Sequence, residues 1–456
     1  MNARDRVALF LDGLRKSRFV SAWWRSWGWP YFAMAAGLVL ASAAWAQYYP
    51  GILTLFFRDQ GYQTANDTAR SFIFTGVAWN HLVPYLQYPL EYPFLAGGLM
   101  LLVNLAGYAF RPDALAALQS ALFFSSVMMG AACAAVVTLW ARCRVPAYKA
   151  LLLFALSPLV LDQFDINFDM WAAALLLASV YLLARGRRGW SAASLALSAG
   201  IKGFPLIALP LMAWYAAHPG GRGASARYAA TCLGVFGAGM AFQYALSPTN
   251  FLRAGSYLSG YGIEGSWLGL LFPSSIIDYL SFSTWSSWIA LGSTALHGLQ
   301  PYQLASLALL GACLALVWRA RRRLAPKVAA FYLVSAVVLF WWWSPPQFLY
   351  YPLALLPLVA PRFLPALALV AGWQFFGTDP LWIRVPPSVV AFTSPDWLYL
   401  SVGYQACLAA YLVWTWRHGG FSPARAPPSQ ESRSLGGPPA GGGTQSGPRS
   451  ARGGRE

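Results

Sequence analysis

The sequence predicts an all-α integral membrane protein of the multi-pass type, with about twelve transmembrane helices. Hydrophobic residues make up 58% of the 456-residue chain and charged residues only 10%, and the mean hydropathy is +0.48. Soluble domains do not have this composition. Lysine and arginine give a net charge of +17, but they gather in short segments between apolar runs. This pattern indicates orientation in a membrane and not binding to nucleic acid.

Residues 1–28 form a basic segment that precedes a first apolar run at about 29–46. No small-residue cleavage site ends this run and many apolar runs follow it, so we expect a retained helix and not a signal peptide. The basic segment then lies in the cytoplasm, as do the later basic clusters. These clusters are Arg142, Arg144 and Lys149; Arg185, Arg187 and Arg188; Arg222 and Arg227; Arg319 to Arg323; and Arg417.

The next two apolar runs, at about 94–109 and 114–141, cannot both cross the membrane if the Arg142 cluster is cytoplasmic. The first has about 16 residues, whereas a span needs roughly 20, so we expect a re-entrant or interfacial helix there. The second run crosses. Further spans are predicted at about 147–161, 170–184, 190–202, 205–217, 228–246, 300–320, 328–343, 349–361, 363–377 and 397–416, which places both ends of the chain in the cytoplasm.

Residues 29–417 therefore form one predicted transmembrane domain. Residues 418–456 are rich in Gly, Pro, Ser and Arg and cannot bury enough apolar surface to fold, so they are expected to form a disordered cytoplasmic tail. The five cysteines are scattered through apolar stretches without the spacing of a metal site or a disulfide framework. We interpret them as packing residues.

The most polar part of the membrane domain is the predicted first extracytoplasmic loop with its re-entrant helix, residues 47–113. It carries acidic side chains and a histidine among aromatic rings that can stack on sugars or lipids. A charge at the edge of a bilayer is costly unless it has a use, so we expect a reaction site here. The residues are Asp59, Asp67, His81 and Glu91, with Trp79, Tyr85, Tyr88 and Tyr92.

The predicted topology brings other unusual polar residues to the same external face. Together they indicate a cavity at the level of the membrane that opens to the outside. They are Asp162, Asp165 and Asp169; Lys202 at the end of a helix; Glu264; and Ser344 to Gln347.

Four ordered blocks carry a resemblance to a known family. They are Asp67 with Val83-Pro84-Tyr85 and Glu91-Tyr92-Pro93; Phe168-Asp169-Met170 with Ile201-Lys202-Gly203-Phe204-Pro205; Ile263-Glu264-Gly265-Ser266-Trp267; and Ser344-Pro345-Pro346-Gln347-Phe348. In this order they resemble glycosyltransferase family 87, bacterial integral-membrane transferases of the GT-C fold that use polyprenyl-phosphate sugars. Ser71, Phe94 and Pro346 depart from the family pattern, and these departures bear on the subfamily and the sugar.

The resemblance implies that Asp67 is the general base that deprotonates the acceptor hydroxyl. Asp67 could instead cap the helix that follows it, and Asp59 is the rival base. Lys202 is implied to hold the phosphate of the donor, since the helix break at Gly203 and Pro205 would expose its ammonium group to the cavity. The alternative is a lysine whose side chain extends to lipid headgroups.

The remaining candidates are expected to shape the substrate pocket. Asp169 could pair with Lys202, contact acceptor hydroxyls or cap its own helix. His81 could assist acid–base chemistry or contact phosphate. No histidine and carboxylate spacing typical of a metal site is present in the sequence, so no essential metal or other cofactor is expected. The alternative is Mg²⁺ or Mn²⁺ bound at the aspartate-rich external face. Further predicted pocket residues are Glu91, Glu264, Gln347, Tyr85 and Tyr92.

The function implied by the resemblance is transfer of a hexose, with mannose as the expected sugar, from a polyprenyl-phosphate donor to an envelope glycolipid or glycan. The active site would face outward from the bacterial plasma membrane, in contact with membrane lipids.

Other function classes fit the pattern of spans. A lipid or sugar-lipid transporter (flippase) would show repeated halves, and no clear repeat is present. A non-enzymatic assembly subunit would use the same residues at protein contacts, and a glycan polymerase or ligase with a lipid-diphosphate donor would have more external arginines.

Overall fold

The computed structural model describes residues 28–59, 80–110, 114–157, 160, 168–260, 262–263, 265–276, 298–344, 346–360, 362–377 and 394–417. Within these ranges the chain is helical, and β structure is limited to isolated bridges between Pro84 and Tyr88 and between Ile263 and Ile276. The predicted all-α fold class is therefore confirmed. Most of the predicted basic N-terminus and all of the predicted tail lie outside the described residues.

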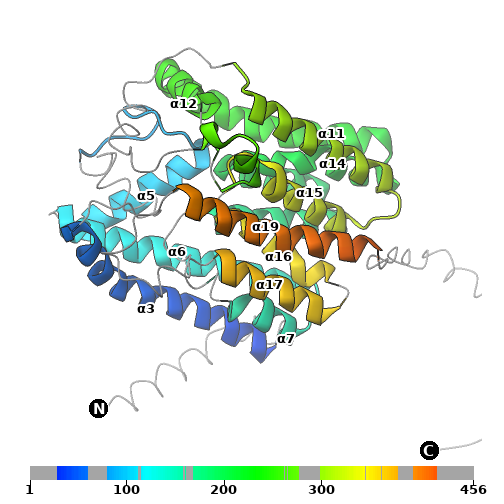
Figure 1. Cartoon of the computed structure of the whole chain (residues 1–456), viewed down its shortest axis with the longest axis horizontal. Helices are drawn as coiled ribbons and strands as arrows, with labels where there is room; N and C mark the ends of the chain where they lie inside the picture. The colour runs from blue at the N-terminus through cyan, green and yellow to red at the C-terminus, as the bar shows by residue number, and fades with distance from the viewer. Residues whose placement is uncertain are drawn as a thin grey trace, which may run out of the picture. The chain divides into compact units, whose positions relative to one another are not determined.

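Most of the described helices follow apolar runs of the sequence, and Figure 1 shows how they are arranged. Short 3₁₀ or π segments, labelled η, sit where a longer run breaks. The elements are α3 Trp29–Asp59, α5 Phe94–Phe110, α6 Ala114–Arg142, α7 Ala147–Ala150, η1 Leu151–Ala155, α9 Asp169–Ala184, α10 Arg188–Ile201, η2 Phe204–Ala208, α11 Leu209–Leu246, α12 Pro248–Gly260, η3 Trp267–Leu270, η4 Pro273–Ser275, α14 Pro301–Ala320, α15 Pro326–Phe340, η6 Pro346–Leu349, α16 Tyr350–Val359, α17 Phe363–Gly377 and α19 Ser394–Arg417.

Three of the described helical segments are long and apolar enough to cross a membrane: Ala116–Arg142, Gly221–Leu246 and Pro301–Ala320. Shorter apolar helices of 10–17 residues accompany them. In the most apolar 18-residue stretch of Gly221–Leu246, only 11% of the residues are buried within the protein, and in that of Pro301–Ala320 only 22% are. Such exposure is expected for helices whose apolar faces meet lipid. The part of the chain that the structure describes is thus that of a helical membrane protein, and the number of about twelve spans stays a prediction.

Three parts of the helix pattern differ from the prediction. The helix α3 continues past Ala46, where the sequence predicts a loop, because residues 52–57 are again mostly apolar. Two predicted spans are joined in α11 across a kink, with non-helical angles at His218 and a φ of 73° at Gly221. The helix α12 is not predicted at all, since no long apolar run marks it.

Helices α9 and α10 form a hairpin that positions the candidate site. The open end of this hairpin carries Asp169, the first residue of α9, and Lys202, which follows the last residue of α10. Since α9 has 16 residues, its two ends are about 24 Å apart. The Ser198 hydroxyl of α10 donates a hydrogen bond of 2.7 Å to the Ala172 carbonyl of α9. This bond holds the open end of the hairpin together.

The hairpin packs against both α6 and α16, and α3 lies lengthwise along α6 (Figure 1). The fully buried Trp140 of α6 donates its indole N–H to the Ala354 carbonyl of α16 at 2.9 Å. At the C-terminus of α16, the Lys149 ammonium donates to the Ala360 carbonyl at 3.1 Å. A cation at this position also complements the helix dipole. Residues far apart in the sequence thus fix α16 next to the hairpin.

Phe94 occupies a space made by two glycines on neighbouring helices. The ring of Phe94, at the start of α5, lies so close to Gly200 of α10 and Gly239 of α11 that a Cβ atom on either glycine would overlap it. The ring also packs against Phe236 with centroids 6.4 Å apart. The absence of a side chain at two positions therefore lets α5 approach α10 and α11 closely.

We expect Gly239→Ala to destabilise the protein by about 1–3 kcal/mol, because the added methyl group overlaps a ring held against two helices. The matched control is Gly237→Ala in the same helix, where an added Cβ meets no atom within 4 Å and where alanine favours the helix by up to about 1 kcal/mol. Thermal unfolding in detergent measures both. Equal melting temperatures for the two variants would contradict this packing.

Candidate functional site

A buried ion pair closes the open end of the α9–α10 hairpin. The Lys202 ammonium lies 3.5 Å from Oδ2 of Asp169, and the two side chains are 6% and 0% exposed. Helix α10 ends here because Lys202 takes extended backbone angles, with φ −137° and ψ 125°. Its side chain therefore turns back toward α9. The pairing of Asp169 with Lys202 proposed from the sequence is present in the structure.

Three aromatic rings surround the Lys202 ammonium. Its Nζ lies 4.4 Å from the ring centroid of Tyr92, 5.3 Å from that of Trp343 and 5.6 Å from that of Phe348. These distances are those of cation–π contacts, in which the negative face of a ring attracts a cation. We call Tyr92, Trp343 and Phe348 the aromatic cage. The cage supplies part of the stabilisation that water would give to an exposed ammonium.

The carboxylate of Asp169 has a second partner in Tyr351. The Tyr351 hydroxyl, which is fully buried on α16, donates a hydrogen bond of 2.9 Å to Oδ1 of Asp169. Asp169 is the first residue of α9, after the N-cap residue Phe168, and a carboxylate at this position also complements the helix dipole. Phe204, just after Lys202, packs against Tyr351 with ring centroids 4.4 Å apart. Apart from its position three residues after Phe348, no feature of the sequence indicates that Tyr351 belongs to the site.

The surroundings of Lys202 differ from the two predicted from the sequence. Lys202 is only 5% exposed, which contradicts both an ammonium open to a cavity and a lysine that extends to lipid headgroups. The reason is the combination of Asp169 on one side and the aromatic cage on the other. The break after α10, at Gly203 and Pro205, directs the side chain inward.

Tyr85 anchors the loop that precedes α5. Its hydroxyl donates to the Pro93 carbonyl at 2.6 Å and accepts from the Gly97 N–H at 2.9 Å. Gly97 lies in the first turn of α5, whose N–H groups lack partners within the helix, and Pro93 has no side chain that can cap them. The Tyr85 hydroxyl therefore acts as a cap from outside the helix, and burial raises its pKa well above the ordinary value.

The same loop is tied to helices α11 and α12. The Asn250 side chain of α12 donates to the carbonyls of Tyr85 and Leu86 at 3.2 and 2.9 Å. The Gln243 side chain of α11 donates to the Tyr92 carbonyl at 3.4 Å. These bonds place Tyr92 over Lys202.

The other predicted residues of this loop have different environments. Glu91 is buried, with 5% exposure, next to the Tyr92 of the cage. His81 is exposed and stacks obliquely on Tyr108, with ring centroids 4.4 Å apart. Its φ of 53° and that of 67° at Tyr85 are unusual for residues with side chains. The loop thus holds a strained backbone between its anchors.

The third and fourth blocks of the sequence meet at α19. The Tyr404 hydroxyl donates to the carbonyl of Gly265, at 2.9 Å, and contacts that of Ser344. The neighbouring Gln405 donates its amide to Gly265 at 3.1 Å and accepts from the Trp267 N–H at 3.0 Å. Tyr404 therefore holds Gly265, in the third block, beside Ser344, the first residue of the fourth block.

Several predicted residues cannot be placed in this arrangement. Asp67, Glu264, Asp162 and Asp165 lie outside the described residues, and of Gln347 only the backbone, in η6, is described. Among the residues that the structure does describe, no group of three or more His, Cys, Asp or Glu side chains could hold a metal ion. The roles of Asp67 as base and of the pocket residues stay predictions.

Comparison with protein families identifies the chain. The model of glycosyltransferase family 87 matches residues 92–345, which is more than half of the sequence. The chain belongs to glycosyltransferase family 87. No curated protein sequence matches it. The matched region starts after Asp67 and contains Tyr92, Asp169, Lys202 and Trp343. The ion pair and two of the three rings of its cage therefore lie within the family domain.

Loss of one partner of the ion pair should destabilise this family 87 protein by about 3 kcal/mol, because the other charge is left buried without compensation. We expect this for Lys202→Met and for Asp169→Asn, each measured by thermal unfolding in detergent. The double variant should recover most of the loss, since it leaves no buried charge and asparagine still accepts from Tyr351. A double variant as unstable as the sum of the two single variants would contradict an ion pair at this site.

Proposed function

We propose that the protein transfers a hexose, expected to be mannose, from a polyprenyl-phosphate donor to an envelope glycolipid or glycan. Membership of glycosyltransferase family 87 supports sugar transfer over transport. The observation that carries the proposal is the convergence of three of the four sequence blocks on the end of the α9–α10 hairpin, with the third block linked to the fourth. Tyr92 comes from the first block, Asp169 and Lys202 from the second, and Phe348 from the fourth, while Tyr404 links the third to the fourth.

The charge of Lys202 supports a role with the donor phosphate. A charged pair inside an apolar helical protein is costly, and such pairs usually have a function. Among the described residues, the ammonium meets one carboxylate, that of Asp169, and the rings of the aromatic cage, while it has three N–H groups to donate. A phosphate oxygen is a stronger partner than a ring face. Because Lys202 is buried, we expect donor binding to move a ring of the aromatic cage aside. The phosphate would then reach the ammonium from that side, and the rings would also contact the sugar or the first isoprene units.

The proposed reaction is a single displacement. The acceptor oxygen attacks the anomeric carbon of the sugar, the bond from that carbon to the phosphate oxygen breaks, and polyprenyl phosphate leaves. Asp67 would take the proton of the acceptor hydroxyl, and Lys202 would stabilise the negative charge that develops on the leaving phosphate. The configuration at the anomeric carbon inverts, so a β-linked donor gives an α-linked product. Glu91, Glu264, Gln347, Tyr85 and His81 are the remaining proposed pocket residues.

Charge distribution supports an outward-facing site in a bacterial plasma membrane. The buried pair lies at one end of α9, and Arg185 and Arg187 lie just past its other end. The separation of about 24 Å is close to the thickness of a hydrocarbon core, about 30 Å. Arginine-rich ends are usually cytoplasmic, which would place Asp169 and Lys202 toward the outside and both termini inside.

The first test is sugar transfer by the purified protein in lipid, with polyprenyl-phosphate-mannose as donor and a membrane-lipid extract as acceptor. We expect product from the wild type and a loss of at least about a hundredfold for Asp67→Asn, since proton transfer contributes roughly 10²–10⁴-fold. Asp59→Asn is the matched control and should remain active. Product from Asp67→Asn at the wild-type rate would exclude Asp67 as the base, and product only from a lipid-diphosphate donor would replace the proposed donor class.

A second test separates the proposed phosphate role of Lys202 from a purely structural one. The double variant Lys202→Met, Asp169→Asn should be folded but inactive, because it lacks the cation that would stabilise the leaving phosphate. The variant Lys202→Arg keeps the charge and should retain measurable transfer with a raised KM for the donor. Wild-type activity in the double variant would show that the pair only stabilises the fold.

A further inference from the structure

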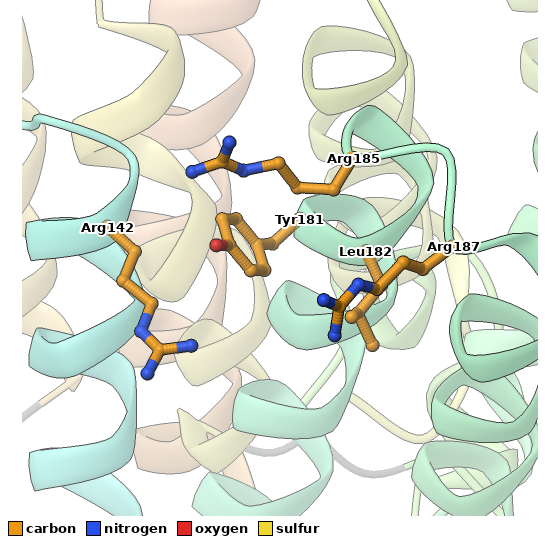
Figure 2. Close-up of a pocket in the computed structure, with 5 residues that line it drawn as sticks. All are labelled: Arg142, Tyr181, Leu182, Arg185 and Arg187. Carbon is orange, nitrogen blue, oxygen red and sulfur yellow. The ribbon is translucent and has the colours of Figure 1, made fainter.

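A cavity of about 400 Å³ lies at the opposite end of the α9–α10 hairpin from the ion pair. It is lined by Arg142 at the end of α6, by Tyr181 and Leu182 in the last turn of α9, and by Arg185 and Arg187 in the turn to α10 (Figure 2). We call these five residues the arginine pocket. Its volume is in the range of small-ligand sites, roughly 300–1,000 Å³.

The arginine pocket has the composition of an anion site. Its charged lining residues are all arginines, and none of the five described lining residues is acidic. The Arg185 guanidinium lies over the Tyr181 ring, 5.5 Å from its centroid, so one planar group is held against another. Figure 2 shows Tyr181 between the side chains of Arg142 and Arg187, with Arg185 above the ring. Three guanidinium groups thus border one space.

Further positive charge acts on the same region. Burial raises the pKa of the neighbouring Cys143 thiol, and the charges of Lys327 and Arg185 oppose that rise. Lys327 belongs to the first turn of α15, so a fourth element contributes a cation close to α6. Glu91 and Asp169, the two acidic side chains whose burial is described, take no part in the lining of the pocket.

Helix dipoles do not account for all three arginines. Arg142 and Arg185 lie at the C-terminal ends of α6 and α9, where a cation is favourable. Arg187 is the N-cap residue of α10, and Arg188 follows it, with no acidic residue in the first turn. Cations at a helix N-terminus are unfavourable unless an anion compensates them. A bound anion in the pocket would supply that compensation.

Two exposed aromatic residues that follow pocket residues in the sequence, Trp190 after Arg187 and Tyr148 after Arg142, indicate the depth of a membrane surface. Trp190, in the first turn of α10, is 70% exposed, and Tyr148 on α7 is 51% exposed. Exposed aromatic residues with polar edges are typical of the interface between lipid and water. Basic pockets between membrane helices on the cytoplasmic side bind the headgroups of anionic lipids. Leu182 and the Tyr181 ring supply an apolar wall beside such a headgroup.

We propose that the arginine pocket binds a phosphate group carried by an anionic lipid of the surrounding leaflet. The phosphate would accept hydrogen bonds from the guanidinium groups of Arg142, Arg185 and Arg187, and the lipid chains would extend along the exposed apolar surfaces of the helices. The bound headgroup would fix the turn between α9 and α10, about 24 Å from Asp169.

The test measures binding of phosphatidylglycerol to the purified full-length protein in neutral phosphatidylcholine nanodiscs. The pocket variant combines Arg142→Gln, Arg185→Gln and Arg187→Gln. The matched control combines Arg319→Gln, Arg322→Gln and Arg323→Gln, which removes the same charge from exposed arginines outside the pocket. We expect binding at least about tenfold weaker for the pocket variant and close to wild type for the control. Equal losses in the two variants would overturn the proposal.

Two further measurements keep the outcome interpretable. The single variants Arg185→Lys and Arg185→Gln are compared with the wild type. Arg185→Lys keeps the charge and should bind the lipid with an affinity between the other two, because lysine cannot form a bidentate contact. Equal affinities of the two folded variants would argue against charge as the basis of binding. Inorganic phosphate provides the second measurement. If phosphate displaces the lipid only at high concentration, the ligand is the lipid. If phosphate alone binds tightly to the wild type and not to the pocket variant, the pocket is a phosphate site and its assignment to a lipid is overturned.

Discussion

The salt bridge between Lys202 and Asp169 is the constraint on which the arrangement at this end of the molecule depends. If two opposite charges that are enclosed by apolar helices were separated, each would be buried without a partner or water, at a large cost in free energy. The end of α10 must therefore stay beside the start of α9, which fixes the register of the hairpin. Each buried charge also needs partners besides the other one. Tyr351 serves Asp169 in this way, and the aromatic cage serves Lys202.

Much of this fold is predictable from the pattern of apolar runs and basic clusters. The bounds of α6, α9, α14 and α17 agree with the predicted spans to within about one or two residues, since a long apolar run bounded by polar residues has few alternatives. The pairing of Asp169 with Lys202 is also predictable, because each is an isolated charge at the end of an apolar helix. Both signals are local in the sequence.

The parts that could not be predicted depend on contacts between distant residues. Tyr351 and Trp343 lie in apolar surroundings where an aromatic residue gives no periodic signal, so their contact with the ion pair emerges only in three dimensions. The cap that Tyr85 gives to α5 likewise replaces the local Ser, Thr, Asp or Asn on which sequence rules rely. The burial of Lys202 depends on distant residues in the same way, since a helix break exposes a side chain only when no ring covers it.

The space that Phe94 shares with Gly200 and Gly239 has a consequence for how this chain can evolve. The ring of Phe94 fills the space that side chains at Gly200 and Gly239 would otherwise occupy, so the sizes of the three residues are coupled. A relative with the smaller proline at the position of Phe94 would have an empty groove there, which larger residues at the two glycine positions could fill. The three columns should therefore covary in an alignment of close relatives, and a single replacement at any of them should be rarer than a compensated set.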